Sequence, residues 1–168
     1  MTYKTHILFA IVIAETSLSI SDTNISVKNG LISLFILIIS SLLPDIDEEK
    51  SKISQIIPLT KLLNLKHRGI THNIFGSAFF IFITYTIISY FQLNIIYFYS
   101  FIIGYLSHIL GDLLSYSGLS FFLTKKTLKL PGFGHYLVGT YQEIRIYNIL
   151  LLIQISFFIY YYLSVTSI

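Results

Sequence analysis

The chain alternates long runs of apolar residues with short polar connections. Five such runs cover residues 6–20, 30–43, 74–91, 95–114 and 144–165. Their length and composition predict helices that enter a bilayer. The first two are shorter than the roughly 20 residues that a full span needs, so a partly embedded hairpin is the alternative for them. The pattern therefore predicts an all-α fold, a polytopic membrane helix bundle with about five transmembrane or membrane-embedded helices.

The composition supports this class of protein. Of the 168 residues, 54% are hydrophobic and 11% are charged, and the mean hydropathy of +0.75 is far above that of a soluble domain. No linker, low-complexity tract or internal repeat divides the sequence, so we expect residues 1–168 to form a single domain. The sequence has no cysteine. Disulfides and thiolate ligands are therefore excluded, and any metal must be held by imidazole and carboxylate groups.

The basic residues are sorted along the chain. If all five runs cross the bilayer, every Lys and Arg except Lys28 falls on one side. By the positive-inside rule that side is cytoplasmic, which predicts a multi-pass protein of the inner membrane with its C-terminus outside. This sorting accounts for the net charge of +3, and no soluble part is large enough to bind nucleic acid. The residues on the cytoplasmic side are Lys4, Lys50, Lys52, Lys61, Lys66, Arg68, Lys125, Lys126, Lys129 and Arg145.

Two ionisable residues interrupt the fourth apolar run. His108 and Asp112 lie in the sequence Gly-Tyr-Leu-Ser-His-Ile-Leu-Gly-Asp, and residues four apart share one face of a helix. Placing such groups inside a span costs several kcal/mol, so they usually face the bundle interior and mark a functional site. Their spacing would allow both side chains to bind one metal ion.

Other polar residues are expected at the same membrane depth. Asp45 and Asp47 follow Pro44 at the end of the second run, and we expect Pro44 to force the residue before it out of helical geometry. Two histidines flank a predicted turn just before the third run. Imidazole and carboxylate together suit a divalent metal, zinc or manganese. The residues that converge on this cytoplasmic level are His6, Asp45, Asp47, His67, His72, His108, Asp112 and Glu143, with His135 in the last loop on the same side.

Each of these residues also has a simpler interpretation. Asp45 and Asp47 are also consistent with a solvated acidic exit from the membrane. Arg68 alone would be an ordinary membrane anchor, and Thr71 alone an ordinary N-cap of the third helix. Glu15 lies on the helix face opposite His6, so we expect it to serve in helix packing or at the outer end. A metal site and polar packing at helix ends both remain possible from the residues alone.

The cytoplasmic connections are expected to meet the membrane surface. Between residues 51 and 66, apolar side chains recur at helical spacing with Lys52 and Lys61 among them, although Pro58 divides the run. This stretch predicts either an interfacial helix that binds membrane lipid or a lid packed on the bundle. The stretch from Ser115 to Gln142 is rich in glycine and basic residues, and we expect either a loop there or a loop that contains a short interfacial helix.

Several motifs in this order resemble a known family. They are His6 near the start, Leu-Pro-Asp-Ile-Asp, His-Arg-Gly-Ile-Thr-His, and the segment with His108 and Asp112 followed by Ser-Tyr-Ser-Gly. This set resembles the bacterial and archaeal inner-membrane family of predicted metal-dependent hydrolases, which includes the LexA-regulated membrane proteins. That family is similar in turn to zinc-dependent phospholipases C and single-strand nucleases, which use a His-x3-Asp and a His-x3-Glu. Here His108 and Asp112 match the first element, but Gly139 stands four residues before Glu143, so the resemblance implies one or two metals rather than three.

The resemblance implies a membrane hydrolase. His108, Asp112, His72 and one of Asp45 or Asp47 would bind the metal, with His6 and His67 completing the set. The substrate would be a phospholipid or another ester at the membrane surface, Arg68 would stabilise developing negative charge, and Glu143 would be a ligand or base. The alternative is a non-catalytic membrane protein with a structural metal or a polar helix-end cluster. A transporter is less favoured, because no discontinuous pair of helices is visible.

Overall fold

The computed structural model describes residues 1–21, 25–48, 51–56, 71–116, 118–120, 127–128 and 136–166. In the described residues the elements are mostly helices, with one antiparallel pair of two-residue strands and an isolated bridge between Ser115 and Tyr136. In chain order the elements are α1 (Tyr3–Ser21), α2 (Val27–Leu42), the 3-10 helix η1 (Leu43–Asp47), α3 (Lys52–Ile56), α5 (Ile74–Tyr90), α6 (Ile95–Leu113), β1 (Leu119–Ser120), β2 (Thr127–Leu128) and α7 (Tyr141–Thr166).

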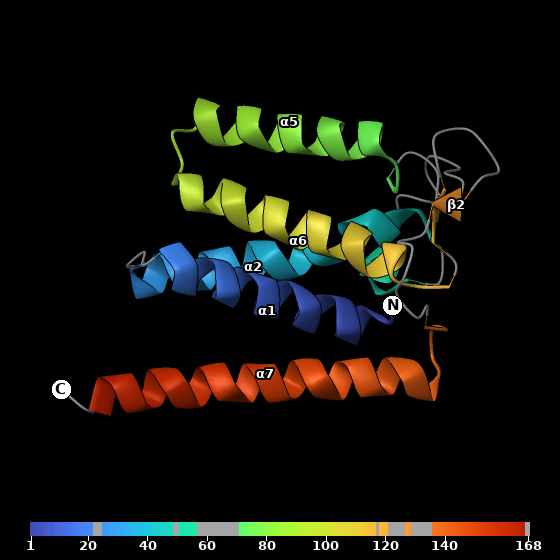
Figure 1. The fold of residues 1–168 in the computed structure, drawn as a ribbon. Helices are drawn as coiled ribbons and strands as arrows, with labels where there is room; N and C mark the ends of the chain where they lie inside the picture. Colours follow the sequence, from blue (N-terminus) through green and yellow to red (C-terminus); the bar gives the residue numbers. More distant parts are fainter. Residues whose placement is uncertain are drawn as a thin grey trace.

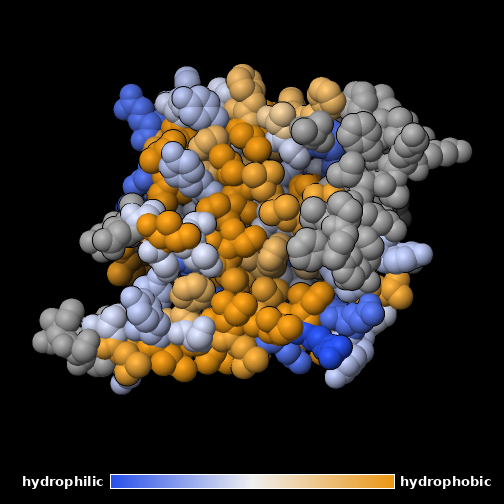
Figure 2. Space-filling view, in the orientation of Figure 1, coloured by the Kyte–Doolittle hydropathy of each residue, from blue (hydrophilic) through white to orange (hydrophobic). Residues whose placement is uncertain are grey.

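The predicted membrane helix bundle is confirmed. In the described part of the chain, four helices are long and apolar enough to cross a bilayer, including the first two, and α5 adds a shorter apolar helix. Strongly hydrophilic residues lie mainly toward the two ends of the face in Figure 2, and apolar residues occupy much of the middle. The interfacial stretch expected at residues 51–66 begins with α3, and its remainder lies outside the described residues.

The polarity of this fold is inverted relative to that of a soluble domain. Large apolar side chains such as Phe35, Phe82 and Phe158 are mostly exposed, whereas histidine, aspartate and serine side chains are buried. In water the apolar surface would drive aggregation, but against lipid it is the favourable surface, and the buried polar groups must be satisfied inside the bundle. The helices therefore enclose a polar interior.

Helix α6 is the centre of the bundle. It packs against α1, α2 and α5, while α7 packs mainly against α1 at the edge (Figure 1). The last turns of α2 and α6 and the first turns of α5 and α7 lie at the same end of the bundle as the N-terminus, and the C-terminus lies at the opposite end (Figure 1). The ends of α2 and α6 that carry the predicted site residues therefore meet at one end of the molecule.

Three polar contacts tie α7 to α1 at different heights. Glu143 accepts a hydrogen bond from the backbone N–H of Thr2 at the end with the connections. Farther along, Gln154 Nε2 donates to Glu15 Oε1 at 2.9 Å, which gives Glu15 the packing role expected for it. Near the other end the hydroxyls of Ser19 and Tyr161 lie 2.9 Å apart. These ties hold an otherwise lipid-exposed helix to the bundle.

The expectation for Pro44 is wrong. Leu43 keeps right-handed helical dihedrals, with φ −58° and ψ −37°, and the chain passes directly from α2 into η1. Proline is tolerated here because it occupies the first turn of the 3-10 helix, where a backbone N–H would have no partner in the helix. This continuous turn directs Asp45 and Asp47 back toward the bundle rather than out into solvent.

Helices α2 and α6 touch most closely at Gly104. A Cβ added there would lie 2.0 Å from Ser40 Oγ and 2.6 Å from the backbone oxygen of Leu37. Because that oxygen belongs to a helix, the backbones themselves would have to separate. Gly104→Ala is therefore expected to destabilise the protein by about 1–3 kcal/mol, measured by thermal unfolding in detergent.

Gly30 is the matched control for this substitution. It is also helical, but an added Cβ would lie 4.0 Å from the nearest atom, a methyl group of Ile25. Gly30→Ala should leave stability unchanged or raise it by up to about 1 kcal/mol, because alanine is the better helix former. Equal effects of the two substitutions would contradict the close contact of α2 and α6.

Candidate metal centre

His108 presents one ring nitrogen to the interior of the bundle. Its side chain is fully buried, and Nδ1 lies 2.7 Å from the backbone oxygen of Ser41 at the end of α2. A carbonyl oxygen only accepts, so Nδ1 carries the proton and the neutral ring has its lone pair on Nε2. Within the described part of the chain, Nε2 has no hydrogen-bond partner. Such a nitrogen is ready to bind a cation.

Four side chains form a closed ring around this position, which we call the His/Asp ring: Asp45, His72, Asp112 and His108. His72 Nε2 lies 3.5 Å from both Asp45 Oδ1 and Asp112 Oδ2. His108 Nε2 lies 3.5 Å and 3.7 Å from the same two oxygens. The two imidazoles therefore occupy opposite corners, and so do the two carboxylates. Asp45, His72 and His108 each offer a ligand atom within 4.8 Å of the other two, so these three could hold one ion, with Asp112 beside both imidazoles.

His72 is oriented by a chain of hydrogen bonds outside the ring. The hydroxyl of Thr71 donates to Asp47 Oδ2 at 2.6 Å, and the same hydroxyl oxygen lies 3.1 Å from His72 Nδ1. Since the hydroxyl proton is used on Asp47, the oxygen is free to accept from Nδ1–H. The phenol of Tyr105 fixes this turn by donating to the Thr71 carbonyl at 2.6 Å. This arrangement is the usual support of a metal-binding histidine by an outer carboxylate.

The carboxylates around His72 also change its protonation. Burial lowers the pKa of His72, but its contacts with the carboxylates of Asp45, Asp47 and Asp112 outweigh burial and raise its pKa from 6.5 to about 9. Without a metal, the ring therefore holds a proton at neutral pH. The carboxylates of Asp45, Asp47 and Asp112 therefore favour a positive charge at this position.

His6 lies against the ring rather than at one of its corners. Its imidazole stacks on that of His108 with 3.8 Å between the ring centroids, and its Nε2 lies 3.6 Å from Asp112 Oδ1. The amino group of Met1 contacts the same oxygen at 3.3 Å. Gly111 leaves room for His6, because a Cβ there would lie 3.3 Å from the imidazole. His6, His108 and Asp112 form a second possible group of ligands, but His108 has only one available nitrogen to share between the two groups.

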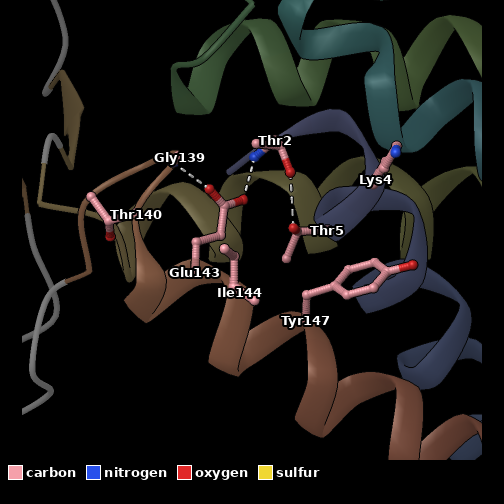
Figure 3. A pocket seen from close by; sticks show the side chains of 8 residues that line it. All are labelled: Thr2, Lys4, Thr5, Gly139, Thr140, Glu143, Ile144 and Tyr147. Atoms are coloured by element: carbon pink, nitrogen blue, oxygen red, sulfur yellow. Dashed lines mark hydrogen bonds between the residues drawn. The ribbon is translucent and has the colours of Figure 1, made fainter.

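Glu143 binds backbone groups. One carboxylate oxygen accepts from the N–H of Thr2, and the other accepts from the N–H of Gly139 at 2.7 Å (Figure 3). Glu143 is only 3% exposed. Both oxygens are therefore occupied by the start of α1 and by the turn before α7.

The structure thus brings together most of the residues that the sequence singled out. Asp45, His72, His108 and Asp112 make up the ring, with His6 and Asp47 in contact with it. The predicted residues His67, Arg68 and His135 lie outside the described residues.

The N-cap assignment of Thr71 is wrong. Asn73 caps α5, with its side chain accepting from the N–H of Gly76 at 2.8 Å. Thr71 instead uses its hydroxyl on Asp47.

Sequence reasoning missed two supports of the site. Tyr105 lies three residues before His108 and so on the same face of α6, a signal that helical spacing carries. The Ser41 carbonyl carries no signal, because every residue has one.

These features define an integral membrane protein with a helical bundle and a buried histidine–aspartate cluster at one end. A family model described as YdjM inner membrane protein matches residues 1–165. The chain therefore belongs to the YdjM inner membrane protein family and is a multi-pass inner-membrane protein. Comparison with curated proteins and with solved structures finds no match. The inner-membrane family expected from the motifs is confirmed, while the hydrolase activity and the similarity to phospholipase C stay predictions.

Proposed function

We propose that this protein is a membrane-bound hydrolase that uses one divalent metal ion, zinc or manganese, held by the His/Asp ring. The observation that carries the proposal is the buried Nε2 of His108, which faces two carboxylates at 3.5 Å and 3.7 Å and has no hydrogen-bond partner in the described part of the chain. A buried imidazole nitrogen left unpaired costs free energy, and a cation bound between it and the carboxylates would remove that cost.

The residues around the ring divide the chemical tasks. When bound, such an ion lowers the pKa of a coordinated water to about 7 and so supplies a nucleophile at neutral pH. Asp45 is the most exposed member of the ring, with 19% of its side chain accessible, and opens the site to water and substrate. Asp47 and Thr71 hold His72, and the Ser41 carbonyl holds His108. Arg68, from the sequence, would stabilise negative charge on the reacting group.

The substrate class follows from location. In the sequence, nearly all Lys and Arg fall in the segments that join the predicted spans on the side of His6, Asp45 and His108, so we place the site at the cytoplasmic surface of the membrane. A phosphodiester or another ester of a membrane lipid would reach the site there without leaving the bilayer surface. Phospholipid is the first substrate to test.

A structural metal is the second candidate function. The ring offers four protein ligands, the number that closes the coordination of a structural zinc site, whereas catalytic sites keep one position for water. In that case the metal would fix the ends of α2, α6 and the turn before α5, with no turnover.

Activity assays on the full chain separate the two functions. Purified protein supplied with zinc or manganese is expected to hydrolyse phospholipid vesicles or a generic phosphodiester. Arg68→Ala should keep the metal but lose roughly 100-fold in rate if the guanidinium acts on the transition state. Bound metal without turnover of any of these substrates would contradict the hydrolase and leave the structural site. Absence of bound metal in the wild type would overturn both.

Metal affinity is expected to depend on pH. Since the pKa of His72 is about 9 in the metal-free ring, an incoming ion must displace its proton at neutral pH. Apparent affinity for manganese should therefore rise with pH by up to about tenfold per unit and level off near pH 9. Titration calorimetry in buffers of different ionisation enthalpy measures the released proton. An affinity that is flat across about pH 6.5 to 8.5 would contradict the proposed role of His72.

A further inference from the structure

Backbone N–H groups engage both carboxylate oxygens of Glu143. Its two carboxylate oxygens accept from the backbone N–H groups of Thr2 and Gly139, and the hydroxyls of Thr5 and Thr2 also face it. Figure 3 shows the carboxylate directed between the start of α1 and the turn before α7. Thr2 Oγ1 and Thr5 Oγ1 lie 3.0 Å apart, so one hydroxyl donates to the other and only one hydroxyl proton is available to the carboxylate beside the two backbone N–H groups. This geometry is that of an anchor.

The anchored segment is the first turn of α1. The carbonyl of Thr2 accepts from the N–H groups of Thr5 and His6 at 3.0 Å and 3.1 Å, so Thr2 begins the helical hydrogen-bond pattern. The first N–H groups of a helix have no partner within it, and the positive end of the helix dipole favours a negative charge. Glu143 supplies a hydrogen-bond acceptor and a negative charge at this helix end. Because Glu143 belongs to α7, α7 provides a cap for α1.

This cap leads directly to the metal centre. The backbone of His6 is bonded to Thr2, and its side chain stacks on His108 and approaches Asp112 Oδ1 at 3.6 Å. The other oxygen of Asp112 is a corner of the His/Asp ring. A rotation of the first turn of α1 would therefore change the environment of a ring carboxylate. The His6 side chain has little room to move, because it is only 1% exposed and is packed against Gly111.

We propose that Glu143 is a positioning residue, which caps α1 from α7 and thereby holds His6 against Asp112. The proposal rests on the proposed metal function for its link to affinity, but the cap itself does not depend on a metal. It replaces the ligand or base role that the sequence suggested for Glu143. Through this cap, α7, which packs mainly on α1, would influence the position of His6 at the metal centre.

The test uses the full chain in detergent with cobalt as a spectroscopic probe. In Glu143→Gln, the single remaining carbonyl oxygen can accept from only one of the two N–H groups, and the amide NH2 would face the other. We expect the visible cobalt bands to stay in place, because the ligands are unchanged. The apparent dissociation constant should rise roughly 10-fold, as for loss of an outer partner. Glu143→Asp, which keeps the charge and both acceptors, should restore part of the affinity.

Glu15→Gln is the matched control, because Glu15 joins the same two helices through Gln154 at a distance from the ring. It should leave cobalt affinity unchanged. Amide hydrogen exchange of residues 2–6 is read on the metal-free proteins, and it should be at least several-fold faster in Glu143→Gln and unchanged in Glu15→Gln.

Shifted or lost cobalt bands in Glu143→Gln with normal exchange would make Glu143 a ligand and overturn the positioning role. Unchanged affinity together with unchanged exchange would overturn it as well. If the wild type binds no cobalt, the metal proposal fails, and the exchange of residues 2–6 still decides whether Glu143 caps α1. If Glu143→Gln does not fold, the milder Glu143→Asp is expected to show the same direction of change in exchange and affinity, and wild-type values of both would contradict the cap.

Discussion

His108→Ala is expected to strip the purified protein of its metal. The substitution removes the His108 imidazole, whose tautomer is fixed by the Ser41 carbonyl so that Nε2 faces the carboxylates. Asp45 and Asp112 then have only His72 between them. Loss of a direct ligand should weaken binding by more than the roughly 10- to 100-fold typical of an outer partner. Elemental analysis of wild type and variant, purified with zinc or manganese present, measures the result.

Ser107→Ala is the control for this experiment. Ser107 is buried next to His108 on α6, and its hydroxyl donates to Gly104 within the same helix, so its loss should leave the metal in place. A full complement of metal in His108→Ala would show that the ion binds elsewhere. Loss of metal in both variants would point to general damage to the helix.

Asp45→Asn and Asp47→Asn are expected to differ, although the two aspartates lie two residues apart. Asp45 Oδ1 faces both ring imidazoles at 3.5 Å, whereas Asp47 Oδ2 accepts from Thr71 and supports His72 from outside. Asp45→Asn should therefore approach the loss seen for His108→Ala. Asp47→Asn should weaken binding only about 10- to 100-fold. Equilibrium titration with manganese distinguishes the two.

Thr71→Val provides a check on the outer chain of hydrogen bonds. Because Thr71 links Asp47 to His72, its loss should have an effect like that of Asp47→Asn, and the double variant should be little worse than either single one. Strictly additive effects would mean that Asp47 acts on the metal centre by another route. A larger effect of Asp47→Asn than of Asp45→Asn would reverse the assignment of ligand and support.

The sequence was most informative about features that depend on neighbouring residues or on the thickness of the membrane. Apolar runs predicted the membrane helices, and the four-residue spacing of His108 and Asp112 placed both on one face of α6. The approach of His6, Asp45 and His72 followed from their shared depth in the membrane. That argument needs only the order of crossings and no detail of packing.

The remaining parts depend on contacts that residue type does not reveal. The sequence left open which of Asp45 and Asp47 faces the metal, because the answer depends on the turn after Pro44, where a continued 3-10 helix replaced the expected break. Glu143 carries the residue type of a ligand, yet backbone N–H groups occupy its oxygens. The Ser41 carbonyl that fixes His108 belongs to a group present in every residue.

The hydrogen bonds between α7 and the α1 segment would make the candidate metal centre sensitive to bilayer thickness. The tie at Glu143 and the tie at Tyr161 are 18 residues apart on α7, or about 27 Å along the helix, close to the hydrocarbon thickness of about 30 Å. Helix α7 as a whole has 26 residues and extends about 39 Å, so a thinner membrane would favour its tilting. Because the Glu143 carboxylate accepts from the N–H of Thr2 next to α1, that tilt would act on His6 and Asp112, and lipid chain length would affect the candidate site through α7.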